Sequence, residues 1–289
     1  MIFKGVLNVI FCIGLINAER ECGKSESALK RYKSQIGSGK IELNEINQPF
    51  EATGHDWPWM AHYMKCSSSI IGQKWLLTAA HCKDIPVAAI VYGSDDRTFG
   101  KVAEIKTKYP HPKHQKGIPG YDIMLVELQE PLEFNENVSQ ICLSKTSFST
   151  IPETKTVLTG WGKLFKGLQY WVNTTFSHRI TNDDILFEFT PILHDKIVHF
   201  REREYCADLK TDMICAGGIG EGSTPEDSGG SMMTIINDKF YQQGIIAGGE
   251  MFTVAGRNDT YEDHGYYTDI CQYCDWIKEM TKGEVECEN

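Results

Sequence analysis

The sequence has no excess of basic residues and no apolar stretch long enough to cross a membrane. Its 29 Lys and Arg residues are outnumbered by 39 Asp and Glu residues, and the net charge of −10 argues against a nucleic-acid partner. Only 10 of the 289 residues are proline, and 41% are apolar, so the composition excludes a disordered or fibrous chain. We therefore expect a folded globular protein with one large domain or two of ordinary size.

The first 18 residues are typical of a secretory signal peptide. Lys4 precedes an apolar run over residues 6–16, and Ala18 ends a plausible cleavage site before Glu19. The run is shorter than the roughly 20 apolar residues of a membrane-spanning helix. We therefore expect the mature protein to be secreted, extracellular and free of the membrane once residues 1–18 are removed.

Secretion favours disulfide bonds and asparagine-linked glycans. Nine cysteines remain once Cys12 leaves with the signal peptide, so at least one has no partner within the chain. Cys271 and Cys274 are one helical turn apart, and either could bond Cys287. A zinc site is the weaker hypothesis because these three thiols have no evident fourth ligand. Three glycosylation sequons begin at Asn137, Asn173 and Asn258.

The chain beyond the signal peptide changes character near Trp57. Residues 19–45 are polar and include a Gly-Ser-Gly stretch, which predicts a flexible leader. Short apolar or alternating runs then recur between turn residues, which is typical of an all-β protein. These runs are 70–77, 87–92, 123–128, 156–159, 186–189 and 244–247. Helical spacing occurs only at about 271–282, where Ile270, Tyr273 and Ile277 can share one face.

Three short strings offer a histidine, an aspartate and a serine in this order. They are TAAHC at 78–82, YDIMLVEL at 121–128 and EDSGGS at 226–231. A serine hydroxyl becomes a good nucleophile when an imidazole takes its proton, and a buried carboxylate fixes the tautomer of that imidazole. His81, Asp122 and Ser228 could fill these roles. Any one of them alone would more often be a surface or capping residue, so the flanking residues decide the interpretation.

At these strings the chain resembles the trypsin-like, or chymotrypsin-fold, family of serine proteases. Further matches are WPW at 57–59, TGWG at 159–162, MICAG at 213–217 and GYYTDICQYCDWI at 265–277. The resemblance implies two packed antiparallel β-barrels with a C-terminal helix. The first barrel would cover 46–150 with His81 and Asp122, and the second, with Ser228, would lie in 151–289. It also implies a polypeptide substrate, a protein inhibitor as a further partner, and no metal or cofactor.

The resemblance assigns several supporting residues as well. It implies the disulfide bonds Cys66–Cys82, Cys206–Cys215 and Cys22–Cys142, the last of which would keep a leader attached after activation. The backbone N–H groups of Glu226 and Ser228 would form the oxyanion hole, and Gly222, Gly249 and Gly265 would line the specificity pocket. Because trypsins have aspartate where this chain has Gly222, we expect a large apolar or aromatic residue before the scissile bond.

Two departures from the family pattern bear on activity. Glu226 stands where the family has glycine, so its Cβ could distort the oxyanion hole and its carboxylate could oppose the developing charge. The alternative is that this side chain turns into solvent. Ala247, Gly248 and Gly249 replace a Ser-Trp-Gly string, so a hydroxyl near the catalytic aspartate and a tryptophan beside the cleft are missing.

Activation leaves two sites open. In the family, a cut frees an Ile or Val amine that pairs with the aspartate before the nucleophile, here Asp227. The spacing from Trp57 favours Ile46, whereas the Lys40–Ile41 bond has the chemistry of a tryptic site. We predict a secreted serine endopeptidase that forms an acyl-enzyme on Ser228. The alternative is a catalytically inactive homologue that acts as a binding or regulatory protein.

Overall fold

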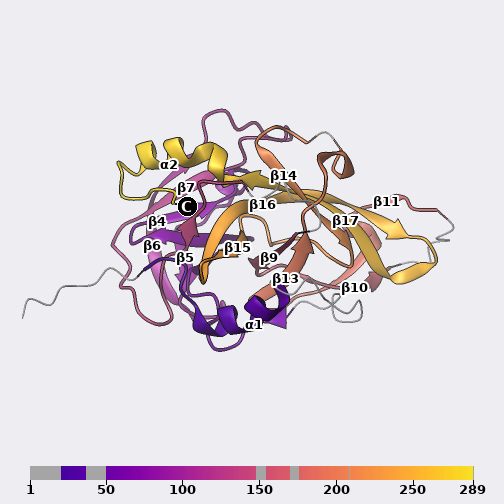
Figure 1. The fold of residues 1–289 in the computed structure, drawn as a ribbon, viewed down its shortest axis with the longest axis horizontal. Coiled ribbons are helices and arrows are strands. Elements are labelled where there is room, and N and C mark those ends of the chain that lie inside the picture. The colour runs from indigo at the N-terminus through magenta and orange to yellow at the C-terminus, as the bar shows by residue number, and fades with distance from the viewer. Residues whose placement is uncertain (1–20, 37–49, 148–153, 170–175, 208, 289) are drawn as a thin grey trace, which may run out of the picture.

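The structure is a computed structural model, and it describes residues 21–36, 50–147, 154–169, 176–207 and 209–288. Six strands form a closed barrel in the order β2-β3-β4-β7-β6-β5. Strands β4, β5, β6 and β7 of this barrel are labelled in Figure 1. Their bounds are β2 Met60–Tyr63, β3 Cys66–Gly72, β4 Trp75–Thr78, β5 Ala89–Tyr92, β6 Lys101–Pro110 and β7 Met124–Leu128. The apolar run 70–77 is divided between two strands, because the chain turns where Gly72 pairs with Trp75.

A second sheet is built from the later part of the chain. Its order is β1-β13-β9-β15-β16-β17-β14, with β8 and β11 also paired to β16. The bounds are β1 Phe50–Glu51, β8 Cys142–Leu143, β9 Lys155–Gly160, β11 Arg179–Ile180, β13 His194–His199, β14 Met213–Ile219, β15 Ser231–Ile236, β16 Lys239–Val254 and β17 Arg257–Asp269. A bridge between Phe200 and Ala216 brings β14 back to the end of β13. This body is therefore a curled half-barrel, and the predicted all-β class is confirmed.

Two short strands from the first part of the chain join the second sheet. β1 and β8 lie within 46–150 but pair with strands of the second sheet. A separate hairpin of β10 (Leu164–Leu168) and β12 (Ile185–Glu188) extends from the second body. The division of the chain at residue 150 remains a prediction.

The C-terminal segment packs against the first barrel. A 3-10 turn at Ile270–Tyr273 leads into α2 at Cys274–Met280, which lies near β4 and β7 in Figure 1. Ile270, Tyr273 and Ile277 are buried in the same apolar cluster as the first barrel. The predicted helical face is thus confirmed. None of the described helices has the length and apolar character needed to span a membrane.

The leader contains a docked helix, so the prediction of a flexible leader was wrong for this part. Helix α1 covers Glu26–Ile36, and its Ala28 and Tyr32 are completely buried. These residues are four apart and therefore lie on one helical face. Tyr32 donates a 2.6 Å hydrogen bond to Asp195, to which Arg31 also donates at 2.8 Å. The Gly-Ser-Gly stretch at 37–39 lies outside the described residues.

Four disulfide bonds cross-link the described chain. They are Cys22–Cys142, Cys66–Cys82, Cys206–Cys215 and Cys274–Cys287. The first three are the pairs that the family resemblance implies, and the fourth selects Cys274 as the partner of Cys287. Cys271 is a free thiol. Burial, together with the nearby Asp269, raises its pKa to about 12, so it stays protonated at neutral pH.

Candidate active site

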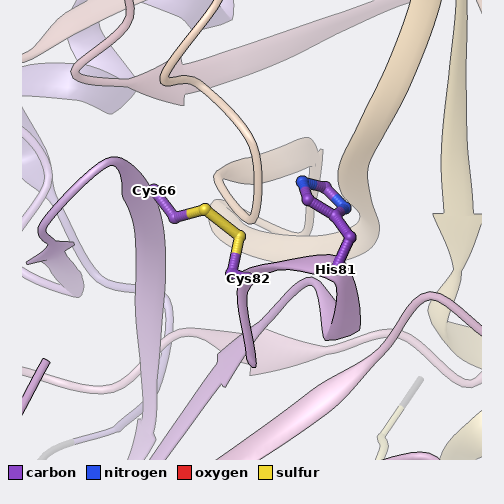
Figure 2. Close-up of side chains that lie close together, drawn as sticks. All are labelled: Cys66, His81 and Cys82. Atoms are coloured by element: carbon purple, nitrogen blue, oxygen red, sulfur yellow. A yellow bond between two sulfur atoms is a disulfide. The ribbon is translucent and has the colours of Figure 1, made fainter. Parts of the chain in front are cut away.

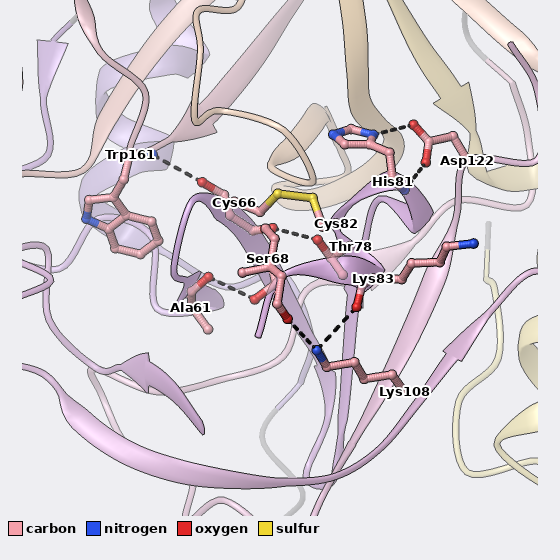
Figure 3. The surroundings of a disulfide bond; sticks show 12 residues. Ala61, Cys66, Ser68, Thr78, His81, Cys82, Lys83, Lys108, Asp122 and Trp161 are labelled. Carbon is pink, nitrogen blue, oxygen red and sulfur yellow. Dashed lines mark hydrogen bonds and ion pairs between the residues drawn. A yellow bond between two sulfur atoms is a disulfide. The ribbon is translucent and has the colours of Figure 1, made fainter. Parts of the chain in front are cut away.

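His81 and Asp122 lie side by side because their strands are paired. His81 belongs to the 3-10 turn Ala80–Asp84 directly after β4, and Asp122 comes just before β7, where Thr78 pairs with Met124. The His81 Nδ1 atom is 2.6 Å from Asp122 Oδ2, and the His81 backbone N–H donates to Oδ1 at 2.8 Å (Figure 3). The carboxylate therefore fixes both the backbone and the ring of His81.

The Cys66–Cys82 disulfide holds the same turn from the other side. It joins β3 to the turn that carries His81, and the close-up in Figure 2 shows the imidazole beside this bond. The three residues place possible metal ligands within 4.8 Å of one another. Because the two sulfurs are bonded to each other, they offer no thiolate to a metal. We therefore assign the Cys66–Cys82 bond a structural role and no metal to these three residues.

Ser228 lies in the turn between β14 and β15, on the second body. Its carbonyl accepts a 2.7 Å hydrogen bond from the Ser67 N–H, which connects this turn to β3. The side chain is partly buried. Among the described residues the Ser228 hydroxyl makes no hydrogen bond, so the structure joins His81 to Asp122 but leaves the third predicted residue unbonded. Nucleophile–base contacts are often loose without substrate.

The backbone of Glu226 has a conformation that residues with a side chain rarely adopt. Its φ of 79° is in the left-handed region, which costs a non-glycine residue roughly 1–2 kcal/mol. The alternative, a side chain turned into solvent, is not the arrangement that the structure has. The side chain is 20% exposed, and its carboxylate lies 3.6 Å from Arg97 Nη1 and 3.6 Å from Lys163 Nζ. In the described structure the N–H groups of Glu226 and Ser228 donate to no protein acceptor and remain available.

Arg97 is a residue of this site that the sequence did not indicate. Its side chain is only 8% exposed, and the guanidinium lies 4.2 Å from the centre of the Phe189 ring. Its Nη1 is also 3.1 Å from His62 Nε2. Burial, and then the Arg97 charge, lower the pKa of His62 to about 4, so this imidazole is neutral and can accept from Arg97. Arg97 is therefore a fixed cation beside Glu226.

Asp227 is buried and paired with a lysine. Its carboxylate accepts from the N–H groups of Gly162 and Thr224 at 2.7 and 2.8 Å, and Lys196 Nζ is 2.9 Å away. Burial alone would raise the pKa of Asp227, but Lys196 and the hydrogen bonds bring it below the usual value. The predicted amines of Ile41 and Ile46 lie outside the described residues.

Neighbouring strands fill part of the space left by the missing Ser-Trp-Gly string. A Cβ atom on Gly248 would lie 2.9 Å from the ring of Tyr266, so this ring occupies room that a side chain at 248 would need. The Thr268 hydroxyl donates to the Asp122 carbonyl at 2.9 Å. His114, which carried no motif, has a side chain that is 5% exposed, and its Nδ1 atom lies 3.8 Å from Asp122 Oδ1.

The three predicted pocket glycines meet around one side chain. Gly222, Gly249 and Gly265 all face the carboxylate of Asp263 on β17. Sequence spacing could not reveal this, because Asp263 is two residues from Gly265 but far along the chain from Gly222. The Asp263 side chain therefore occupies the space between these three glycines.

The sequons differ in their surroundings. Asn137 is partly buried, and its N–H donates to Asn135 Oδ1 at 2.8 Å. The Asn258 Oδ1 atom is buried without a hydrogen-bond partner among the described residues. Asn173 lies outside the described part of the chain. Glycosylation at all three stays a prediction.

Comparisons with known proteins agree with the motifs. The Trypsin family matches residues 46–277. Transmembrane protease serine 11G of Mus musculus is 30% identical over 242 residues, which are 78% of this chain and 52% of the relative. Transmembrane protease serine 11A of Homo sapiens is 27% identical over 281 residues, or 93% of this chain and 60% of the relative. The chain thus spans only about half to three fifths of these relatives.

A solved structure resembles the fold. Neuropsin, a serine protease expressed in the limbic system of mouse brain, superposes with a TM-score of 0.62 at 23% identity. The match covers 81% of this chain and 99% of the neuropsin chain. At this identity the likeness concerns the arrangement of the strands and not the details of the site.

Proposed function

Since the chain belongs to the trypsin family, we propose that it is a secreted serine endopeptidase that cleaves peptide bonds through an acyl-enzyme on Ser228. The observation that carries the proposal is the double contact between His81 and Asp122. It leaves His81 Nε2 free of the carboxylate and fixes the tautomer that a general base requires. The partner of the reaction is a polypeptide, and a protein inhibitor would bind the same surface.

The proposed reaction has two halves. The Ser228 Oγ atom attacks the carbonyl carbon of the substrate, and His81 Nε2 takes the hydroxyl proton. When the tetrahedral intermediate collapses, the carbon–nitrogen bond breaks and His81 returns the proton to the leaving amine. Water then attacks the acyl-enzyme with His81 again as base, which releases the acid and restores the Ser228 hydroxyl. Asp122 keeps its charge and stabilises the imidazolium at each stage.

The oxyanion hole of the proposed enzyme contains Glu226 and Ser228. Their N–H groups would donate to the substrate oxygen as it becomes negative. The Glu226 carboxylate alone would oppose that charge, but Arg97 and Lys163 both lie 3.6 Å from it. These two cations offset its charge, which removes one of the two objections to activity that the sequence raised.

The competing function is an inactive homologue that uses the two bodies as a binding scaffold. The observation that favours it is the unbonded Ser228 hydroxyl, together with the left-handed backbone at Glu226. The two functions differ in what a mutation of the catalytic residues would do. An inactive protein would lose nothing measurable from Ser228→Ala.

Export is part of the proposal and depends on the first 18 residues. The relatives carry names of transmembrane proteases, and the matches cover 52% and 60% of their length. For this chain we propose cleavage after Ala18 and, later, after Lys40 or Glu45, with the leader held by Cys22–Cys142. N-terminal sequencing with and without reduction would identify these cuts.

Peptidase kinetics test the proposal directly. Ser228→Ala and His81→Ala should each lower kcat by at least about 10⁴-fold, and the double variant should be no slower, because the residues act as one unit. His55→Ala is a matched control, because this histidine lies outside the site and should not alter kcat. A double variant markedly slower than either single variant would contradict the assignment.

A further inference from the structure

The structure places a second imidazole, besides the one that Asp122 binds directly, against the same carboxylate. It belongs to His114, in the segment between β6 and β7, where the neighbouring Lys113 and Gln115 are exposed. The His114 side chain is only 5% exposed, and its Nδ1 atom lies 3.8 Å from Asp122 Oδ1. Its backbone N–H donates to the His111 carbonyl at 3.0 Å, so a tight turn precedes the inward-facing ring.

The His114 ring has no other polar partner among the described residues. Both of its nitrogens are buried without a hydrogen bond, and Asp122 is its ion-pair partner in this part of the chain. A buried polar group without a partner is costly, so such groups are nearly always hydrogen-bonded. The 3.8 Å separation exceeds a good N–H···O bond by about 0.6 Å. Hydrogen bonds of a catalytic site are often this long without substrate and tighten in the complex.

The Asp122 carboxylate can accept a further hydrogen bond. The two that the described residues provide both come from His81, one to each oxygen. A carboxylate oxygen has two lone pairs, so Oδ1 can accept from His114 as well as from the His81 backbone. The Asp122 side chain is 10% exposed, and a donor to a carboxylate that water hardly reaches stabilises its charge. A third donor would therefore keep Asp122 ionised and oriented toward His81.

The protonation state of His114 determines which of its atoms can donate. Burial lowers the pKa of His114, and the Asp122 charge opposes this effect. The other titratable groups that face the ring are His81, Lys83 and Asp84 of the turn after β4, and His111 of its own segment. The ring is therefore neutral at pH 7 and carries one N–H. Because a carboxylate can only accept, that hydrogen belongs on Nδ1, which faces Oδ1.

From this geometry we propose that His114 is a positioning residue, which holds Asp122 through a hydrogen bond from its Nδ1–H to Oδ1 in the substrate complex. The inference rests on the proposed peptidase function and adds a residue that acts through Asp122 and does not touch the substrate. No proton passes through His114. The bond matters most when His81 is protonated, because Asp122 must then keep its charge and its orientation. Its loss should therefore affect kcat more than KM.

The first test is the kinetics of two His114 variants on one peptide substrate. His114→Phe keeps a ring but removes both nitrogens, and it should lower kcat by about 10-fold or more with KM changed less than about twofold. The acid limb of the kcat/KM profile should move up by about 0.5 pH unit, because Asp122 then attracts the proton on the base more strongly. His114→Asn keeps an N–H donor near the Nδ1 position, so its kcat should stay within about threefold of wild type. Equal losses in the two folded variants, or a Phe variant with unchanged kcat and pH profile, would overturn the proposal.

His111→Phe provides the matched control. It removes an imidazole from the same segment, and the new ring can keep the stacking on Tyr121, whose centre is 5.1 Å from that of His111. The described structure has no ion pair between His111 and Asp122. Both kcat and the acid limb should therefore stay close to wild type. The same loss of kcat and the same shift of the acid limb as in His114→Phe would reduce the effect to packing of the segment and overturn the proposal.

The second test locates the proton and needs no catalysis. Long-range ¹H–¹⁵N spectra of the histidine-labelled Ser228→Ala protein distinguish the two neutral tautomers from the charged ring, and His114→Asn identifies the His114 signals by their loss. At pH 7 we expect a neutral His114 with its proton on Nδ1. A proton on Nε2, or a charged ring, would overturn the proposal and leave the peptidase function intact if a fluorophosphonate labels the wild type. A processed wild type that resists this reagent would contradict the peptidase function, and the positioning role with it.

Discussion

Replacing Lys196 with methionine tests how the loop before the nucleophile is held. Lys196 supplies the only ammonium or guanidinium bonded to Asp227 among the described residues, and Asp227 is 3% exposed. Breaking a buried ion pair by removing one partner costs about 3–5 kcal/mol. The hydrogen bonds from Gly162 and Thr224 survive the substitution. We therefore expect the free energy of unfolding at pH 7 to fall by about 3 kcal/mol, at the lower end of that range.

The loss should depend on pH in a defined direction. The pKa of Asp227 is lowered in the folded wild type, so its ion pair stabilises the protein above the unfolded pKa near 4. That contribution disappears as the pH falls through the folded pKa. Without Lys196, burial is no longer offset, and the pKa of Asp227 must rise. The difference between wild type and Lys196→Met should therefore be largest near pH 7 and shrink as the pH approaches 4.

Urea denaturation and fluorophosphonate labelling would measure these effects on the uncleaved chain. Lys166→Met is the matched control, since Lys166 is half exposed and its partner Glu188 is equally so. The double variant Lys196→Met, Asp227→Asn should regain stability relative to Lys196→Met, because no buried charge is left alone.

Labelling of Ser228 in the uncleaved chain should slow by about tenfold or more in Lys196→Met, since its backbone follows Asp227 directly. An uncleaved Lys196→Met protein that is as stable as wild type and is labelled as fast would refute this reasoning. It would mean that the loop is ordered by other contacts, or only by an amine released at Ile41 or Ile46.

Substitutions at three further positions test the surroundings of the site. Arg97→Met should lower kcat by about 100-fold, because the Glu226 carboxylate then faces the developing oxyanion with one less cation beside it. The double variant with Glu226→Gln should recover most of the lost kcat. Glu226→Gly alone should raise kcat by relieving the left-handed backbone, whereas Glu226→Gln alone should change it little, as peptide kinetics would show. Burial lowers the pKa of His194 to about 4, so the free energy of unfolding should fall by on the order of 3 kcal/mol between pH 6.5 and 4, and His194→Leu should reduce that slope in urea titrations.

The sequence was most informative where the chemistry lies in short strings. TAAHC and EDSGGS place His81 and Ser228 beside local landmarks, and strand pairing then brings Asp122 to His81. The strand runs and the C-terminal helical face follow from residue spacing, which depends on local burial alone. The leader helix escaped prediction because its stability comes from buried contacts with Asp195, on a distant strand.

Contacts between distant segments explain what the sequence could not indicate. Arg97 and Glu226 are far apart in the sequence, and the residue before Arg97 forms a bridge with Ile192 of the second body. The family resemblance identified the three pocket glycines, but it did not show which neighbouring side chain occupies the space between them. Asp263 fills it from β17, and no local pattern distinguishes this aspartate from a surface one.

Labelling of the secreted, leader-cleaved protein with a fluorophosphonate, followed by peptide mapping, tests the central claim most directly. The reagent reacts with a serine only when a base and oxyanion donors activate it. The account predicts one modified residue, Ser228, with no modification in His81→Ala. Folded, correctly processed protein in which Ser228 stays unmodified would contradict the account and favour the inactive binding scaffold.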